Sequence, residues 1–242
     1  MAKRSAPDAS VLTRTWRWTW RALLLVLGLL LAWQLWFFGH ILWWRTHNPS
    51  TSAFMEDRLE LLQEKKPGAQ LRHQWVPYER ISNNLKRAVI AAEDAKFLDH
   101  EGFDWEAIQK AYERNLQKGK VVRGGSTISQ QLAKNLFLSS QRTPWRKAQE
   151  AVITVMLETS MGKRRILEIY LNVIEWGNGV FGAEAAARHY FGTSAAALSA
   201  EQAARLAAMV PNPRYFDRRR DSPYLARRAD IILARMNSAQ LP

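Results

Sequence analysis

One carboxylate in the sequence, Glu93, is a candidate for acid–base chemistry. Glu93 opens an acidic stretch that follows an apolar helical pattern and reads Glu93-Asp94-Ala95-Lys96-Phe97-Leu98-Asp99-His100-Glu101-Gly102. If helical geometry continues through it, Glu93, Phe97 and His100 share one face, and a carboxylate beside an apolar ring is suited to general base or acid work. The alternative, which spacing alone favours, is a solvated helix end with a capping histidine. A metal site is a weaker interpretation, because no HExxH or comparable spacing is present.

A glycine-containing loop supplies candidate anion-binding groups. It reads Arg123-Gly124-Gly125-Ser126-Thr127-Ile128-Ser129-Gln130-Gln131 and is followed by Lys134 and Asn135. Paired glycines let backbone N–H groups converge on an anion, and Ser126 or Thr127 can cap the next helix. The spacing of a Walker A motif is missing. Taken alone, the segment is a loop that starts a helix.

Two further segments carry charges at helical spacing. In Trp145-Arg146-Lys147-Ala148-Gln149-Glu150, the arginine and the glutamate fall one helical turn apart. Such a pair is most often a surface salt bridge. The other segment is Lys163-Arg164-Arg165-Ile166-Leu167-Glu168-Ile169-Tyr170-Leu171-Asn172. Its apolar positions are expected in a core and its charges on a solvated face.

Helices must position these motifs, because sustained alternation of apolar and polar residues is almost absent. Asp104 is a predicted N-cap, Thr143-Pro144 a predicted helix start, Gly162 a helix stop, and Ser199 to Gln202 resembles a capping box. The predicted helices are Asn83–Asp94, Trp105–Gln117, Pro144 to Gly162, Lys163–Ile174, Ala183–Tyr190, Ala203–Val210 and Pro223–Met236. The predicted fold class is mainly α.

The composition limits the size and the partners of this folded part. The 242 residues make one ordinary domain, or one domain plus an appendage, and the absence of cysteine excludes a disulfide framework and thiol chemistry. The net charge of +13 indicates anionic ligands or neighbours, such as nucleic acid, lipid headgroups or phosphorylated substrates.

The appendage is an apolar segment near the N-terminus. Ala22–Trp44 contains no Asp, Glu, Lys or Arg, and as a helix it spans about 34 Å against a hydrocarbon core of about 30 Å. Residues 1–21 carry five basic residues against Asp8 alone, which predicts a cytoplasmic N-terminus and an external remainder. The alternatives are a cleaved signal peptide and a buried core helix.

These patterns predict four parts of the chain. They are a basic cytoplasmic segment at 1–21, a transmembrane anchor at 22–44, a connector at 45–74 with a short helix near Arg58–Lys65, and a domain at 75–242.

The motifs together, in this order, resemble the family of peptidoglycan glycosyltransferases, which polymerise the lipid-linked disaccharide of bacterial cell walls. The resemblance covers residues from about 75 to 236, and its departures are small: Phe181 stands where tyrosine is usual, and Thr193 where lysine is common. The matching segments are Glu93-Asp94…Phe97…His100…Gly102, Gly125-Ser126-Thr127…Gln130-Gln131…Lys134-Asn135, Arg146-Lys147…Glu150, Ile166-Leu167-Glu168…Tyr170-Leu171-Asn172, Gly179–Ala186, Tyr190-Phe191-Gly192 and Leu206-Ala207-Ala208 before Pro211-Asn212-Pro213.

The resemblance implies a lysozyme-like helical domain with two lobes around a substrate cleft, behind a single N-terminal transmembrane helix. Glu93 is then the general base, and Glu150 assists by positioning a divalent metal (Mg²⁺ or Mn²⁺) or by stabilising the site. Lys134, Arg146 and Lys147 bind the diphosphate of the substrate. The other motif residues expected to bind substrate are Asp94, Phe97, His100, Ser126, Thr127, Gln130, Gln131 and Asn135.

The implied reaction converts lipid II into β-1,4 glycan strands, with inversion at the anomeric carbon and release of polyprenyl diphosphate. No covalently bound cofactor is implied. The implied location is the bacterial inner membrane with the catalytic domain in the periplasm, and the implied partners are lipid II, the growing strand, the membrane and proteins of cell-wall synthesis or division. A muramidase-type hydrolase and a non-enzymatic basic membrane adaptor or nucleic-acid binder remain alternatives. Against the last, an external domain meets anionic lipid instead of nucleic acid.

Overall fold

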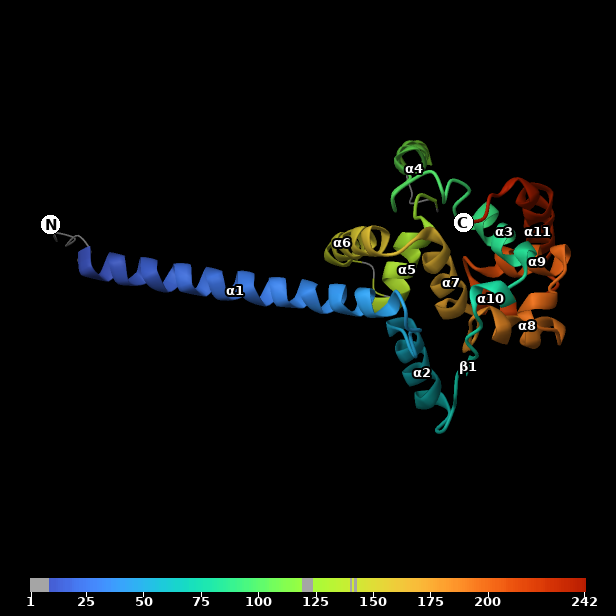
Figure 1. Cartoon of the computed structure of the whole chain (residues 1–242), viewed down its shortest axis with the longest axis horizontal. Helices are drawn as coiled ribbons and strands as arrows, with labels where there is room; N and C mark the ends of the chain where they lie inside the picture. Colours follow the sequence, from blue (N-terminus) through green and yellow to red (C-terminus); the bar gives the residue numbers. More distant parts are fainter. Residues whose placement is uncertain (1–8, 119–123, 140, 142) are drawn as a thin grey trace. The chain divides into compact units, whose positions relative to one another are not determined.

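The structure is a computed structural model that describes residues 9–118, 124–139, 141 and 143–242. The chain divides into two compact units, one ending at Trp43 and one formed by Trp44–Pro242. The first unit is a single long helix, α1 (Ala9–Trp44), shown in blue in Figure 1. Of the described residues, only the stretch Trp16–Trp44 forms a helix long and apolar enough to cross a membrane, by length and composition. The predicted anchor at 22–44 lies inside it, and the helix begins earlier because the basic segment continues it.

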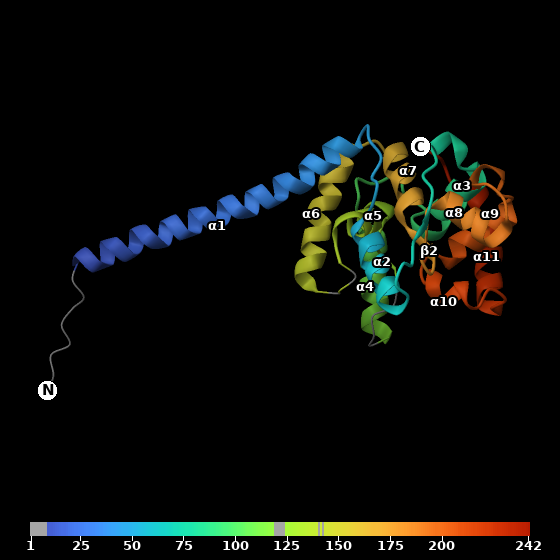
Figure 2. The same ribbon diagram turned by 90° about the horizontal axis from the view of Figure 1, so that it is seen from below.

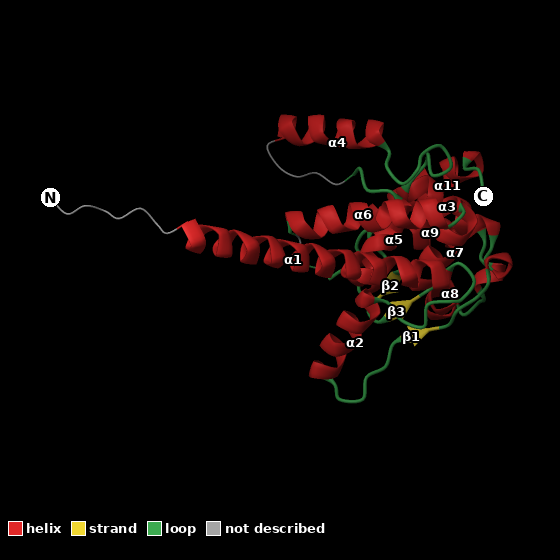
Figure 3. Ribbon diagram, turned by 60° about the vertical axis from the view of Figure 1, so that its left-hand side comes forward, coloured by secondary structure: helices red, strands yellow, loops and turns green. Residues whose placement is uncertain are grey.

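The second unit is built almost entirely from helices, so the predicted mainly-α class is confirmed (Figure 3). In chain order its elements are α2 (Ala53–Lys65), β1 (Arg72–His73), η1 (Tyr78–Arg80), α3 (Asn83–Glu93), α4 (Trp105–Lys118), α5 (Ile128–Phe137), α6 (Pro144–Ser160), α7 (Lys163–Val173), β2 (Glu175–Gly177), β3 (Val180–Phe181), α8 (Ala183–Phe191), η2 (Ala195–Ala197), α9 (Ala200–Met209), α10 (Pro213–Asp217), α11 (Pro223–Arg235) and η3 (Met236–Ser238).

Helix α7 separates two groups of helices within this unit. Figures 1 and 2 both place α2, α5 and α6 on one side of α7 and α3, α8, α9 and α11 on the other. Helix α5 packs on α6 and α7, whereas α9 packs on α3 and α11. Because α7 contacts both groups, its side chains from Ile166 to Val173 are buried except Glu168. The two groups correspond to the two lobes implied by the resemblance.

A small sheet joins the segment after α2 to the rest of the unit. Its strand order is β1-β3-β2, with Arg72 opposite Val180 in a parallel pair and Glu175 opposite Phe181 in an antiparallel pair. Helix α2, opened by the side chain of Ser52, which accepts a hydrogen bond from the Met55 N–H, packs on α5. The segment 45–74, expected as a connector, therefore contains two elements of the compact unit.

Most predicted helices occur with shifted ends. The capping box of Ser199 and Gln202 is present, but it opens α9 at Ala200, three residues before the predicted start. Thr143 caps α6 as predicted, since its side chain accepts a hydrogen bond from the Arg146 N–H. The short helix α10 is absent from the sequence-based assignment, because Pro211 and Pro213 indicate only the end of α9.

Candidate active site

Helix α3 ends at Glu93, so helical geometry does not continue, and Glu93, Phe97 and His100 do not share one helical face. Asp94 leaves the helical conformation, with φ −161° and ψ 72°, and caps α3. Its carboxylate accepts hydrogen bonds from His100 Nε2 at 2.9 Å and from the N–H of Ile128 at 3.0 Å. The second bond satisfies a free donor at the start of α5. Asp94 therefore fixes the end of α3 against the beginning of α5.

The remaining motif residues of this loop hold it in place. Phe97 is fully buried, and the ammonium of Lys163 lies 4.7 Å from the centre of its ring. The same ammonium donates to the carbonyl of His100 at 2.6 Å and to Glu158 at 2.8 Å. Asp94, Phe97 and His100, expected to bind substrate, are thus occupied in contacts that shape the loop.

The glycine-containing loop opens α5 as expected. Thr127 accepts a hydrogen bond from the N–H of Gln130, and the Gln130 side chain accepts one from the N–H of Thr127, which completes a capping box. The Thr127 hydroxyl also donates to the carbonyl of Gly102 at 2.7 Å. Gly125 adopts φ +120°, a conformation that L side chains rarely adopt. Arg123 of this motif lies outside the described residues.

Glu93 contacts side chains from two other helices, and a third helix orients one of these side chains. Gln131 of α5 donates to Glu93 Oε2 at 2.9 Å, and Tyr170 of α7 donates its hydroxyl hydrogen to Gln131 at 2.8 Å. Burial, followed by the charges of Glu93 and Asp94, raises the pKa of Tyr170 well above its ordinary value, so its hydroxyl stays a donor. The guanidinium of Arg228 on α11 lies 3.7 Å from Glu93 Oε1. Glu93 thus has a polar contact at each oxygen while its side chain keeps 10% of its surface exposed.

Glu150 has different surroundings. Arg146 Nη1 donates to its Oε2 at 2.8 Å, and the ammonium of Lys147 donates to its Oε1. The i,i+4 pair expected from spacing is present, but it is not a surface pair, because the Glu150 side chain is only 4% exposed. Lys147 also reaches the hydroxyl of Ser126 at 3.5 Å. Glu150 therefore fixes two cations and links them to the glycine-containing loop.

A cavity of about 450 Å³ brings the motif residues of several elements together. Lys134, Asn135 and Arg146 line it, together with Tyr170 and with Gln131, which donates to Glu93. Glu93 and Glu150 are themselves not among the lining residues. The ammonium of Lys134 lies 5.4 Å from the ring centre of Phe54. The other lining residues, which the sequence interpretation did not assign to a site, are Phe54, Ile174, Glu175, Val210, Pro211, Asn212, Pro213 and Arg214.

The sequence interpretation did not identify two residues in or next to this cleft, because each contacts residues that are far away in the sequence. Glu175 of β2 contacts Arg58 at 3.0 Å and Arg214 at 3.6 Å. Burial raises the pKa of Glu175, while the two arginines act in the opposite direction. Arg228 reaches Glu93 from a helix 135 positions further along the chain. The Pro211-Asn212-Pro213 segment, which also lines the cleft, was part of the resemblance. It was the sequence signal that this part of the chain belongs to the site.

The carboxylates do not fit a divalent metal. Both oxygens of Glu150 accept hydrogen bonds from cationic side chains, so a metal ion would have to displace Arg146 and Lys147. Among the described residues, no group of three or more His, Asp or Glu side chains is arranged to hold a metal ion. The cationic groups that contact Glu150 are the side chains of Arg146 and Lys147.

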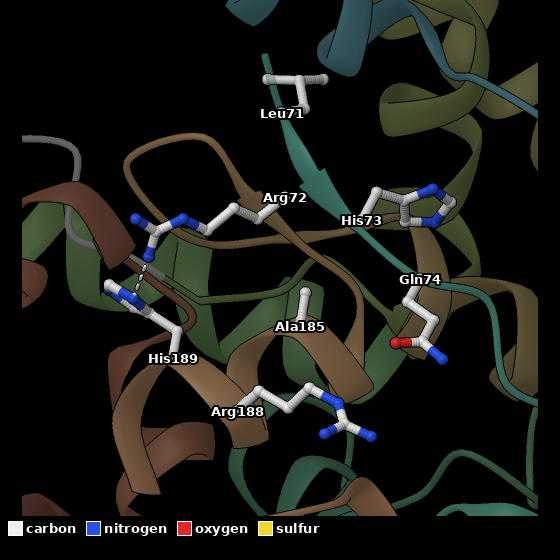
Figure 4. A pocket seen from close by; sticks show the side chains of 7 residues that line it. All are labelled: Leu71, Arg72, His73, Gln74, Ala185, Arg188 and His189. Atoms are coloured by element: carbon white, nitrogen blue, oxygen red, sulfur yellow. Dashed lines mark hydrogen bonds between the residues drawn. The ribbon is translucent and has the colours of Figure 1, made fainter. Parts of the chain in front are cut away.

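Another cavity, of about 390 Å³, lies over β1 and α8 and is shown in Figure 4. Its cations already have partners: Arg72 donates to His189 at 2.6 Å, and Arg188 pairs with Glu184 at 2.7 Å. Burial lowers the pKa of His73, whose Nε2 donates to the carbonyl of Asn172. None of the expected catalytic or substrate-binding residues lines this cavity. The candidate active site is therefore the cleft lined by Lys134, Arg146 and Gln131, with Glu93 bound to Gln131.

Comparison with known proteins supports this assignment. A model of the transglycosylase family matches residues 59–237. The chain is 69% identical over 223 residues to a biosynthetic peptidoglycan transglycosylase of Methylobacillus flagellatus, covering 92% of this chain and 97% of that protein. It is 65% identical over 226 residues to the protein of the same name from Nitrosospira multiformis, covering 93% and 98% of the two chains. With a third such protein, from Chromobacterium violaceum, the identity is 66% over 212 residues, covering 88% and 93%.

The family match includes every motif quoted above, and the names of these relatives describe a glycosyltransferase activity. The family and the enzyme class expected from the motifs are thereby confirmed, and the chain belongs to the transglycosylase family.

Proposed function

We propose that the chain is a membrane-anchored peptidoglycan glycosyltransferase that polymerises lipid II into β-1,4 glycan strands. The observation that carries this proposal is the contrast between the two carboxylates. Glu93 is held by a neutral amide and faces one guanidinium, whereas Glu150 binds two cations directly. Glu93 therefore suits a base that must accept a proton, and Glu150 suits a group that orders positive charge.

In the proposed reaction, the 4-hydroxyl of the acceptor sugar loses its proton to Glu93. The hydroxyl oxygen forms a bond to the anomeric carbon of the growing chain from the face opposite the leaving group. The bond from that carbon to the diphosphate oxygen breaks, and its electron pair leaves with the polyprenyl diphosphate. Attack from the opposite face inverts the anomeric carbon.

The departing diphosphate requires fixed positive charge. Lys134 and Arg146 line the same cavity, and Lys147 lies beside Arg146 on the first two turns of α6. Charge-assisted hydrogen bonds from such groups stabilise the negative charge that develops on the leaving oxygen. A muramidase cutting a neutral glycosidic bond has no need of these cations beside its acids. This comparison favours transfer over hydrolysis.

The lipid-linked substrate explains the apolar surfaces of the protein. The stretch Trp16–Trp44 of α1 is suited to anchor the chain in the inner membrane, with residues 1–21 in the cytoplasm and the catalytic unit in the periplasm. Helices α4 and α6 expose large apolar side chains, which suit contact with lipid; they include Trp105, Tyr112, Leu116, Trp145, Val152 and Val155. Proteins of cell-wall synthesis or division are the expected partners.

The test is polymerisation by the full chain in detergent, supplied with lipid II. We expect glycan strands from the parent chain, and a rate lower by about 10²–10⁴-fold for Glu93→Gln, which keeps the hydrogen-bonding shape but cannot act as a base. Circular dichroism should show that the variant is folded. Absence of polymer from the parent, or cleavage of preformed glycan strands instead, would overturn the proposal.

A further inference from the structure

A cavity of about 370 Å³ lies between α3 and α11, next to Glu93 but lined by residues different from those of the active-site cleft. Helix α3 contributes Ala91 and Ala92, the two residues immediately before Glu93. Helix α11 contributes the rest of the lining, which consists of Tyr224, Arg227, Arg228, Ile231, Ile232 and Arg235. We call it the α3–α11 cavity.

The charge of this cavity is positive and largely uncompensated. Among the described residues, the one ion pair that its arginines form joins Arg228 to Glu93 at 3.7 Å. In the part of the chain that the structure describes, neither Arg227 nor Arg235 has an acidic side chain within 4.0 Å, and both are exposed. Arginine binds carboxylates through two parallel N–H groups, so a pair of exposed guanidinium groups in a cavity favours an anionic ligand.

The spacing of the cations indicates the shape of that ligand. Arg227 and Arg235 are separated by about 12 Å along the helix. Two exposed apolar side chains lie on the same lining, Tyr224 and Ile231. One face of the Tyr224 ring is already stacked on Phe216, with the ring planes 5° apart. A compact diphosphate needs converging cations, whereas this arrangement suits an extended ligand in which carboxylates alternate with apolar groups.

We propose that the α3–α11 cavity binds the carboxylate-bearing stem peptide of the substrate strand. The inference rests on the proposed function, because a base at Glu93 must touch the sugar that it deprotonates. Arg228 borders both Glu93 and the cavity, so that sugar lies at the cavity mouth. A peptide carried by the neighbouring sugar then extends along α11, where Arg227 and Arg235 bind its carboxylates.

The test uses the full chain in detergent and a soluble peptidoglycan fragment, a disaccharide peptide without lipid or phosphate. The variant Arg227→Gln/Arg235→Gln leaves Glu93 and Arg228 unchanged. We expect it to bind the fragment about tenfold more weakly than the parent does, since two charge-assisted contacts are lost. The control Arg218→Gln/Arg219→Gln removes equal charge from exposed positions outside both cavities and should bind like the parent.

Two further probes identify which chemical groups of the ligand the α3–α11 cavity recognises. A fragment whose peptide carboxylates are converted to amides should bind the parent as weakly as the acidic fragment binds the double variant. Inorganic diphosphate should not displace the acidic fragment. Equal affinity of parent and double variant, undiminished binding of the amidated fragment, or displacement by diphosphate would each overturn the inference. None of these readouts requires polymerisation, so failure of the proposed function is detected separately, as absence of polymer from the parent.

Discussion

Tyr170 controls the orientation of Gln131, and through it the orientation of Glu93. An amide side chain can turn over and exchange its oxygen and nitrogen. The hydroxyl of Tyr170 donates to the Gln131 oxygen, which leaves the amide N–H directed at Glu93. Since the raised pKa keeps this phenol protonated, the orientation persists throughout the neutral pH range.

Tyr170→Phe should therefore slow polymerisation without unfolding the protein. Losing one hydrogen bond of about 1 kcal/mol corresponds to a rate lower by about fivefold to tenfold, with KM little changed. The matched control is Tyr190→Phe, which removes a hydroxyl bound to the carbonyl of Trp176 from a residue that does not line the cleft. Initial rates for both variants make the comparison, and a parent-like rate for Tyr170→Phe would remove the residue from the positioning of Glu93.

Glu150 is a buried counter-charge for two cations. Glu150→Gln leaves Arg146 and Lys147 without it, and losing a hydrogen bond to a charged group costs about 1.5–3 kcal/mol. We expect a lower unfolding temperature and a lower polymerisation rate. Raising the Mg²⁺ concentration should not restore the rate, because the carboxylate acts through the two side chains. Recovery of the rate with Mg²⁺ would instead support metal positioning by Glu150.

Helix α5 carries both Gln131 and Lys134, so its N-terminus matters for activity as well as for stability. Thr127→Ala removes the capping box and the hydrogen bond to Gly102, at a cost of about 1–2 kcal/mol. We expect a lower unfolding temperature together with slower polymerisation, and partial recovery in Thr127→Ser.

A second capping box in the same protein provides the control for this variant. Ser199→Ala removes the cap of α9, which contributes no lining residue to the active-site cleft. It should lower stability by a similar amount while the folded fraction keeps the parent rate. Equal loss of rate in both variants would mean that the caps act through global stability alone.

Helix α10 is attached to the sheet and to α8 through Asp217. Burial alone would raise the pKa of Asp217, but hydrogen bonds from His189, the N–H of Asn178 and Arg220 outweigh it and hold the pKa below its ordinary value. A carboxylate with a lowered folded-state pKa contributes stability above its ordinary pKa. That contribution is lost as the pH falls through the folded-state value.

Asp217→Asn should therefore lower the unfolding temperature by a few degrees at pH 7. The difference from the parent should shrink as the pH falls below about 4, and it should vanish only below the lowered folded-state pKa, where the carboxylate is protonated in both states. Thermal unfolding followed by circular dichroism across this range measures the difference. A constant difference would show that the charge of Asp217 is not what stabilises α10.

At the scale of the whole molecule, the proposal that the long apolar helix anchors the chain also predicts which side of a membrane the catalytic unit occupies. The basic excess before residue 22 predicts that the N-terminus stays in the cytoplasm. A reporter enzyme that is active only outside the cytoplasm should therefore work when fused after Pro242. Activity restricted to a cytoplasmic reporter in the same position would contradict the orientation and the access to an external lipid-linked substrate.

Patterns within a few residues were sufficient to predict several helices of this protein and its family. Proline, capping residues and helical periodicity predicted α6 and α11, and an uninterrupted apolar run predicted a long N-terminal helix. The ordered motifs predicted the family, which the comparisons confirm. These features depend on local conformational preferences and on residue identity, so they can be read before any packing is known.

Packing decided what the motif residues contact. The helix ends at Glu93 because Asp94 binds the start of α5, and Glu150 is buried because α6 packs on α5. The contact between Glu93 and Arg228 exists because α3 lies against α11. Each of these contacts joins residues on different helices whose local patterns carry no information about one another, and only the packed helices bring them within hydrogen-bond or ion-pair distance.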